Sequence, residues 1–499
     1  MTVRQTDDPL RSSRVQLWLR HAALPIALHM LLCLGLYQSG LSQTEMVRLR
    51  IDGPSHLIDA YVKAAHLYGP WGVVRAYFRG ESDERLYLEY ARLLLQGEVD
   101  LAFVANRQND PRMLTSLPER AWPYRDVRVE YPPLSFLAFA PPALISTAYT
   151  AYRSGFIAYM LALHLCNLWL AFQLLAPAAD PVQRARRGAR VLYASLLFCA
   201  ALGSLVVTRM DHLAVTWTLL SLLALKRAEH TRGRARLVSA GACGACAMLG
   251  AMTKLVPGFA LLAAILVWLR SAAPDRQRCI VVSLGAAAVC ALAINLPLFA
   301  WVGDRYLDTF RYHGRRGIQI ESVYAGLLML LRPLGLDLQV EESYGSTNLA
   351  TSVTSIVKLL SPCAFALGAG YVAFRRRFTN DAAGATWLCC TWLLIFMLSN
   401  RVFSPQYLIW VAAPVCVLAT LGPRELRLAA LFLAAVLISQ LIFPRGYPLL
   451  KTFHPLGVAL LNLRNLLLLA FTVALVRSFA QRRVDIPNRF QGPGSARRG

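Results

Sequence analysis

Long apolar segments alternate with short polar connections along most of the chain. At least ten of these segments approach the roughly 20 residues that an α-helix needs to cross a hydrocarbon core. Two further apolar segments, 133–150 and 323–336, are shorter, and we expect re-entrant or interfacial helices there. If 133–150 crosses the membrane instead, the number of transmembrane helices changes, within a range of 11–14. The expected spans lie near residues 22–41, 154–176, 191–208, 210–226, 237–253, 255–270, 279–301, 351–374, 382–399, 406–421, 427–444 and 455–477. The pattern predicts an all-α integral membrane protein with about 12 transmembrane helices.

The composition agrees with this class of protein. The 499 residues are 56% apolar and only 16% charged, with a mean hydropathy of +0.44. These values exclude a soluble enzyme, a disordered chain and a coiled coil. The net charge of +24 follows the membrane topology, so we expect membrane lipids and no nucleic acid as partners. No cleavable signal peptide is evident before the first span.

The 11 cysteines all lie in or at the ends of apolar segments, so no disulfide framework is expected. Cys243 and Cys246 have the spacing of a redox or metal-binding pair. They belong to a run of small residues at 239–251, and this setting favours helix packing over either chemistry.

Basic clusters set the predicted orientation, because Lys and Arg near membrane spans mark the cytoplasmic side. With every cluster placed inside, both termini are cytoplasmic, and 19 of the 28 acidic residues fall in two outer loops, 42–132 and 302–350. The expected organisation is a cytoplasmic segment at 1–21, a single transmembrane domain at 22–477 and a disordered basic tail at 478–499. The Arg-rich inner loops favour a bacterial inner membrane.

The first outer loop is too long to be a simple connector. Its residues 54–78 mix aromatic and basic side chains, as in a helix that lies in the membrane interface. A second helix is expected at 82–95, with Ser82 as the N-cap and Gly97 just past the end.

Eight cations break the orientation rule by lying at or near the outer face. Snorkelling to lipid headgroups explains Arg153. For Arg209, Lys254 and Arg401, which occupy short outer turns, we favour convergence on a lipid-linked phosphate. The eight are Arg153, Arg209, Lys254, Lys358, Arg401, Arg445, Lys451 and Arg464. No Asp or Glu lies in the middle of a span, which disfavours an ion-coupled transporter.

Asp83, Tyr87 and Tyr90 share one face of the second loop helix. Asp83 is a candidate general base for an attacking hydroxyl, although an acid in a first helical turn also stabilises the helix dipole. Glu130 precedes a rigid Tyr-Pro-Pro turn at the membrane surface. His313, Arg315, Arg316 and Glu321 form another polar cluster in the second loop. No phosphate-binding glycine loop, HExxH or Ser-His-Asp motif is present.

These motifs together resemble the GT-C glycosyltransferases, and among them family 87, the polyprenyl-phosphate-mannose-dependent mannosyltransferases. The resemblance covers about residues 80–415. It rests on Asp83-xxx-Tyr87-xx-Tyr90, Pro123-Tyr124-Arg-Asp126, Glu130-Tyr131-Pro-Pro-Leu134, Arg209-Met-Asp211, Lys254-xx-Pro257, Arg316-Gly-Ile-Gln319-Ile-Glu321 and Ser404-Pro-Gln406-Tyr407-xx-Trp410. The segment 97–123 is longer than the family pattern suggests, which leaves the identity of the acceptor open.

The resemblance implies an essential Asp at the membrane surface, which Asp83 matches by position. It also implies a sugar, expected to be mannose, on a polyprenyl phosphate, and a glycolipid or glycan acceptor outside the cytoplasm. Arg209, Lys254 and Arg401 would then bind the donor phosphate, and Asp83 would activate the acceptor hydroxyl for an inverting transfer. The expected substrate-binding residues are Tyr87, Glu130, Tyr131, Asp211, His313, Arg316, Gln319, Glu321, Gln406 and Tyr407.

We expect no cofactor; Asp83, Glu130 and Asp211 could hold a divalent metal, but the proposed chemistry does not require one. Two other functions stay open. A transporter or flippase of lipid-linked saccharides would use the outer cations without a base, and a ligase would move a whole glycan from a lipid pyrophosphate.

Overall fold

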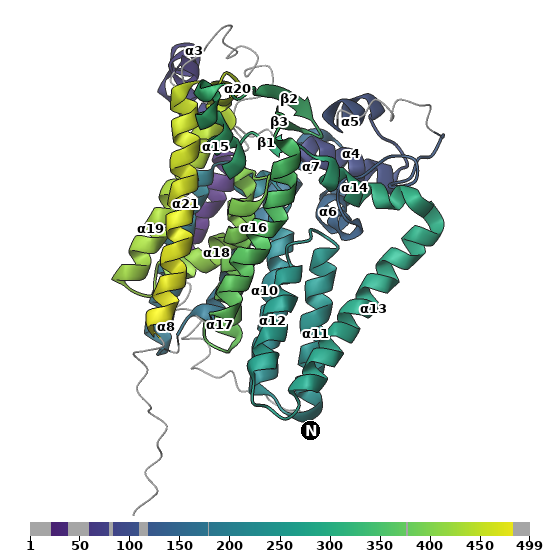
Figure 1. Cartoon of the computed structure of the whole chain (residues 1–499), viewed down its shortest axis with the longest axis vertical. Coiled ribbons are helices and arrows are strands. Elements are labelled where there is room, and N and C mark those ends of the chain that lie inside the picture. The colour runs from purple at the N-terminus through teal and green to yellow at the C-terminus, as the bar shows by residue number, and fades with distance from the viewer. Residues whose placement is uncertain are drawn as a thin grey trace, which may run out of the picture.

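The computed structural model describes residues 21–37, 59–78, 83–108, 118–177, 179–375 and 378–482. Long helices run side by side, and short helices and a small sheet gather at one end of this bundle, here called the loop-rich end (Figure 1). Ser82 and residues 1–20 of the predicted N-terminal segment lie outside the described residues, as does the predicted tail beyond residue 482.

Each of the twelve predicted spans contains a helix. The first is the helical segment at 21–36, which ends in the π-helical turn Leu31–Leu36 (η1). The others are α7 (Tyr149–Leu175), α8 (Pro181–Leu202), α10 (Asp211–His230), α11 (Gly233–Ala251), α12 (Gly258–Arg270), α13 (Arg276–Val302), α16 (Thr354–Phe374), α17 (Ala382–Ser399), α18 (Ile409–Leu418), α19 (Pro423–Gln440) and α21 (Pro455–Arg482).

Within the described residues, six helices are both long and apolar enough to cross a membrane. They are α7, α13, α16, α17, α19 and α21; the helical segments of α13 and α19 continue to Arg315 and Arg445. The protein is therefore an integral multi-pass membrane protein, while the count of twelve spans stays a prediction. The basic α10–α11 and α12–α13 connections lie at the end opposite the sheet (Figure 1), as the charge pattern predicts.

The loop-rich end contains the remaining elements. α6 has ten residues and ends before a break at Ser146, so it covers about 15 Å and is too short to cross. The second short apolar segment forms α15 and a 3-10 turn, and α15 packs against α21. The elements are α3 (Asp59–Tyr77), α4 (Glu84–Leu95), α5 (Leu101–Gln108), η3 (Pro133–Ser135), α6 (Phe136–Ile145), α9 (Leu205–Thr208), η4 (Gly303–Leu307), α14 (Asp308–Arg315), α15 (Val323–Leu331), η5 (Arg332–Leu334), η6 (Pro405–Leu408), η7 (Leu441–Arg445) and α20 (Tyr447–Lys451).

A three-stranded antiparallel sheet in the second loop was not expected from the sequence. Its strands β1 (Ile318–Gln319), β2 (Gln339–Ser343) and β3 (Ser346–Ala350) lie in the order β1-β3-β2. Ile318 pairs with Leu349, and Glu341 pairs with Asn348. The strands are too short and too polar to give a clear alternation of apolar residues, so the sequence pattern carries little signal for them.

α4 begins one residue later than predicted, because Asp83 and not Ser82 occupies the N-cap position. The Asp83 side chain makes no capping hydrogen bond to the helix, and it is therefore available for contacts with other elements. Gly97 follows the helix with a φ of +77°, as the sequence predicts for a residue just past a helix end.

The small residues of α11 pack closely against α13, which confirms helix packing at the Cys243–Cys246 motif. Cys243 is buried, and a methyl group added to Gly244 would lie 1.9 Å from the carbonyl oxygen of Ser283. The close approach of the two backbones therefore depends on the absence of a side chain at residue 244.

We predict that Gly244→Ala destabilises the protein by roughly 1–3 kcal/mol, because the α11–α13 interface must separate to accommodate the methyl group. Gly285→Ala on α13 is the matched control, since nothing lies within 4 Å of the added methyl group there. Thermal unfolding in detergent measures the difference; equal melting temperatures for the two variants would contradict close packing at Gly244.

Candidate functional site

Asp83 enters the site from the start of α4 and forms a buried ion pair with Arg209. Arg209 lies in the short connection between α9 and α10, so this contact joins the first outer loop to the helix bundle. Both side chains are less than 10% exposed. The pair thus places a carboxylate beside a cation at a position that is largely shielded from water.

A second buried ion pair holds Lys254, which follows α11. Its Nζ lies 2.6 Å from Oδ1 of Asp211, the first residue of α10. The Trp410 indole also donates to this Asp211 oxygen. Lys254 Nζ lies 5.2 Å from the Trp410 ring centroid and 5.4 Å from that of Tyr407. Asp211 and the two stacked rings therefore fix the direction of the ammonium group.

α14 and the residues after it contribute further polar groups. Nε2 of His313 donates to the carbonyl oxygen of Glu130 over 3.0 Å, which ties α14 to the turn that leads into α6. Arg316 follows at the end of α14, and its Nε is buried without a hydrogen-bond partner. Tyr90 donates to the Glu130 carboxylate.

Glu321 is fully buried between β1 and α15. Its Oε2 accepts hydrogen bonds from Gln319 at 3.3 Å and from Tyr447 at 3.2 Å, while Oε1 has no partner. Burial raises the pKa of this carboxyl to about 7, although Arg464 and the hydrogen bonds favour the ionised form. Glu321 therefore changes its charge near neutral pH.

Eleven of the fourteen predicted site residues line one cavity of about 270 Å³ at the loop-rich end, here called the polar cavity. They are Asp83, Glu130, Tyr131, Arg209, Lys254, His313, Arg316, Gln319, Glu321, Gln406 and Tyr407. They come from loops and helix ends as far apart in the sequence as α4 and η6. The expectation that these residues converge is thus met by the geometry.

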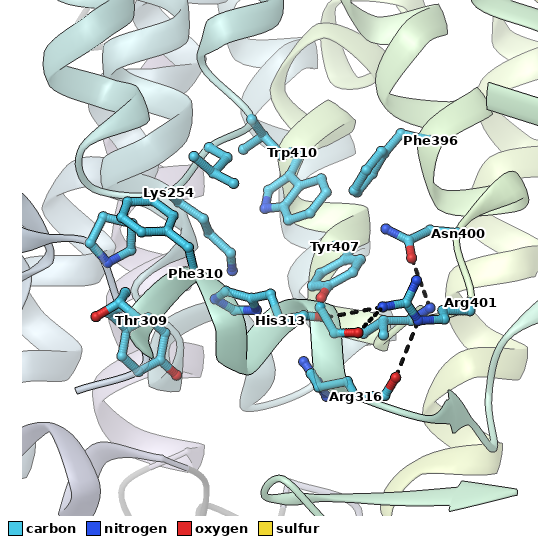
Figure 2. A pocket seen from close by; sticks show the side chains of 16 residues that line it. Lys254, Thr309, Phe310, His313, Arg316, Phe396, Asn400, Arg401, Tyr407 and Trp410 are labelled. Atoms are coloured by element: carbon cyan, nitrogen blue, oxygen red, sulfur yellow. Dashed lines mark hydrogen bonds between the residues drawn. The ribbon is translucent and has the colours of Figure 1, made fainter. Parts of the chain in front are cut away.

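A second cavity of about 380 Å³ adjoins the first, and we call it the apolar cavity (Figure 2). Its walls include Leu255, Val256, Phe310, Phe396 and Trp410. The two cavities share the residues Tyr131, Lys254, His313, Arg316 and Tyr407. Two cations therefore lie at the junction of a polar and an apolar compartment.

Three predicted residues take other positions. Tyr87 stacks on Phe139 with ring centroids 4.5 Å apart, and it lines neither cavity. Asp211 lies behind Lys254 and also lines neither. Both therefore support the site from behind, and direct contact with substrate does not fit their positions.

Arg401 lines only the apolar cavity, and its guanidinium is already engaged (Figure 2). It donates to the backbone carbonyls of His313, Gly314 and Arg316 at 2.9–3.2 Å. These carbonyls at the end of α14 have no partners within the helix, and an arginine satisfies them. This geometry fits a structural role for Arg401, and Arg316 is better placed than Arg401 to bind an anion.

The sequence reasoning missed several residues of the polar cavity. Tyr447 from α20 and the β2–β3 hairpin, with Glu342 and Tyr344, form part of its wall. The only sequence signal for the hairpin was the acidic and aromatic content of the second loop, and Tyr447 lies outside that loop. Arg153, assigned to snorkelling, instead pairs with Glu84 at 3.0 Å.

Several buried polar atoms around the polar cavity have no hydrogen-bond partner. They are Nε of Arg209, Nε of Arg316, Oε1 of Gln319 and Oε1 of Glu321. Buried polar groups are normally satisfied, so an unpartnered group at a cavity wall is typical of a site that binds a polar ligand. Donors and acceptors are both present, which suits a ligand with hydroxyl and anionic oxygens.

A metal at this site remains a hypothesis. Asp83, Glu130 and Asp211 are engaged by Arg209, Tyr90 and Lys254, respectively. Within the described residues, these three carboxylates do not form a group close enough to share one ion.

The pKa of Glu321 gives a testable pH dependence. A carboxyl ordinarily titrates near 4.3 in an unfolded chain, so the folded state holds this proton more tightly. Folding is therefore favoured at low pH, and this stabilisation is lost as the pH rises through about 7. We predict that the melting temperature of Glu321→Gln, relative to the unmodified protein, increases from pH 5 to pH 8.

Glu341→Gln, at an exposed position on β2, serves as the control and should show no such trend. A melting-temperature difference for Glu321→Gln that is constant over this pH range would be inconsistent with a raised pKa.

Comparisons with known proteins identify the family of the chain. The model of glycosyltransferase family 87 matches residues 130–405, which is more than half of the chain. The match includes most of the cavity residues, while Asp83, Tyr87, Gln406 and Tyr407 lie outside it. No curated protein sequence matches the chain.

Two solved structures are similar in overall arrangement at low identity. ArnT from Cupriavidus metallidurans in the apo state has a TM-score of 0.39 at 16% identity, covering 81% of this chain and 73% of ArnT. The archaeal oligosaccharyltransferase AglB from Archaeoglobus fulgidus, in complex with an inhibitory peptide and a dolichol-phosphate, has a TM-score of 0.25 at 12% identity. This match covers 79% of this chain and 52% of AglB. The assignment rests on the family model: the chain belongs to glycosyltransferase family 87 and is a membrane glycosyltransferase.

Proposed function

We propose that the protein transfers a single sugar, mannose, from a polyprenyl phosphate to a glycolipid or glycan acceptor on the extracytoplasmic side of a bacterial inner membrane. The observation that carries this proposal is the junction of the two cavities at Lys254 and Arg316. A sugar on a lipid phosphate is apolar at one end and polar at the other, with an anion between them. The junction offers cations at the matching place.

The apolar cavity suits the first isoprene units of the donor, and the polar cavity suits the sugar and the acceptor. Lys254 and Arg316 would bind the phosphate and stabilise the negative charge that develops on it as the bond to the sugar breaks. Arg209 is close enough to the same cavity to assist. Phosphate is a good leaving group, so this step needs no general acid.

Asp83 is proposed as the general base. It would accept the proton from the acceptor hydroxyl while that oxygen attacks the anomeric carbon on the face opposite the phosphate, which gives inversion. The ion pair with Arg209 orients the carboxylate. A docked phosphate competes for the same guanidinium, so donor binding would weaken the ion pair between Asp83 and Arg209.

We predict that Asp83→Asn lowers the rate of sugar transfer by about 10²-fold or more, because the amide cannot accept the proton. Membranes that contain the protein would be incubated with labelled mannosyl polyprenyl phosphate, and incorporation into acceptor measured. The donor KM should not rise, since the substitution removes a competitor for Arg209. Glu98→Gln, an exposed acid just past the end of α4, should leave transfer unchanged.

Two further donors are assayed in parallel. A glucosyl polyprenyl phosphate tests the preference for mannose, and an oligosaccharide on lipid pyrophosphate tests the ligase function. Transfer of whole glycans would identify a ligase, and movement of the lipid-linked sugar across vesicles without any transfer would identify a transporter. Unchanged transfer by Asp83→Asn would remove Asp83 from the mechanism.

Arg316 and Arg315 offer a matched pair for the phosphate site. Arg316 lines both cavities, whereas Arg315 is exposed and lines neither. We predict that Arg316→Gln lowers kcat/KM for the donor by roughly 10²-fold, because one cation at the phosphate is lost. Arg315→Gln should change it little. Similar losses in both variants would argue for general attraction of the anion and against a specific site at Arg316.

A further inference from the structure

A second cluster of chemically reactive side chains lies away from both cavities. It consists of His29 from the first helix, His164 from α7 and Cys199 from α8, here called the His–Cys cluster. All three side chains are at most 1% exposed. One ligand atom from each lies within 4.8 Å of the others, and this is the one such group of three among the described residues.

The hydrogen bonds around the cluster direct ring nitrogens toward its centre. Nδ1 of His29 donates to the carbonyl oxygen of Pro25 over 2.6 Å, which leaves the lone pair on Nε2. A backbone acceptor for the distal nitrogen is the usual partner of a metal-binding histidine. Nε2 of His164 lies 3.4 Å from Sγ of Cys199. The Ser195 hydroxyl contacts both Nε2 atoms, at 3.1 and 2.6 Å.

These spacings fit a shared metal ion. In a three-coordinate site with metal–sulfur and metal–nitrogen bonds of about 2.3 and 2.0 Å, a sulfur and a nitrogen ligand are about 3.7 Å apart. The sulfur–nitrogen separation of 3.4 Å is close to this value. Small side-chain rotations would bring the third ligand to the same distance, with the Ser195 hydroxyl displaced from the centre.

Charge decides which ion fits. The cluster lies among membrane helices, where an uncompensated charge is costly. One thiolate and two neutral imidazoles balance a monovalent ion but leave a divalent ion with an excess of one positive charge. Thiolate and imidazole ligands also suit Cu⁺. We propose that His29 Nε2, His164 Nε2 and Cys199 Sγ bind one Cu⁺ ion in a three-coordinate site.

Binding would form a copper–thiolate bond and release the thiol proton to solvent, so that the site stays neutral. The ion would link the first helix, α7 and α8. The His164 ring packs against that of His212, with centroids 4.8 Å apart, and His212 follows Asp211, which holds Lys254. The site would therefore brace the helices behind the polar cavity.

The test uses the full-length protein in detergent without oxygen. Cu⁺ is supplied from a chromophoric chelator, and Zn²⁺ is supplied in a parallel titration. We expect one Cu⁺ per chain, an X-ray absorption spectrum with one sulfur and two imidazole ligands, and a higher melting temperature on binding. Cys199→Ser should lose all three effects, while Cys389→Ser, a buried cysteine in α17, should keep them.

Cys33 provides a further check, because its thiol interacts with that of Cys199. Two thiolates would balance Zn²⁺, so a site that prefers Zn²⁺ and needs Cys33 would overturn the three-coordinate copper assignment. Retained Cu⁺ binding by Cys33→Ser would support it. Failure of the unmodified protein to take up either ion would show a purely hydrogen-bonded cluster and overturn the proposal, whether or not the variants fold.

Discussion

The need to pair buried charges shapes the functional end of this protein. Arg209 binds Asp83, Lys254 binds Asp211, and both pairs are largely shielded from water. Removal of one partner from such a pair typically costs about 3–5 kcal/mol, because the other charge stays buried. The first pair connects the outer loop to the bundle, and the second connects α10 to the turn after α11. The same contacts that keep the fold together therefore position the charges of the site.

These pairs also leave the cavity ready for a ligand. Arg209 and Lys254 are each held by one carboxylate. One buried polar atom in each of Arg209, Arg316 and Glu321 has no hydrogen-bond partner. A site with fixed donors needs little rearrangement when charge develops on a bound phosphate, which is the basis of electrostatic catalysis. The adjoining apolar cavity is consistent with the lipid-linked donor proposed above.

The contrast between Arg401 and Arg316 shows that the carbonyl groups at a helix end can determine whether a nearby arginine has a structural or a ligand-binding role. Both line the apolar cavity, and the rule that Lys and Arg near spans mark the cytoplasmic side points only to Arg401 as a candidate phosphate ligand. In the structure, the carbonyls at the end of α14 take up its guanidinium. Arg316 lies at that helix end and faces both cavities. Arg401 therefore supports the segment that presents Arg316.

The sequence by itself determined the helical segments, the membrane class and about half of the residues that line the polar cavity. Apolar length and the placement of charge are local properties, so they can be read without knowledge of the fold. Only the tertiary structure decided that Asp83 pairs with Arg209, that Tyr447 and the β2–β3 hairpin close the cavity, and that His29 lies beside Cys199. Each of these contacts joins segments far apart in the sequence, and helix packing with hydrogen-bond geometry, which no local pattern encodes, selects the partner.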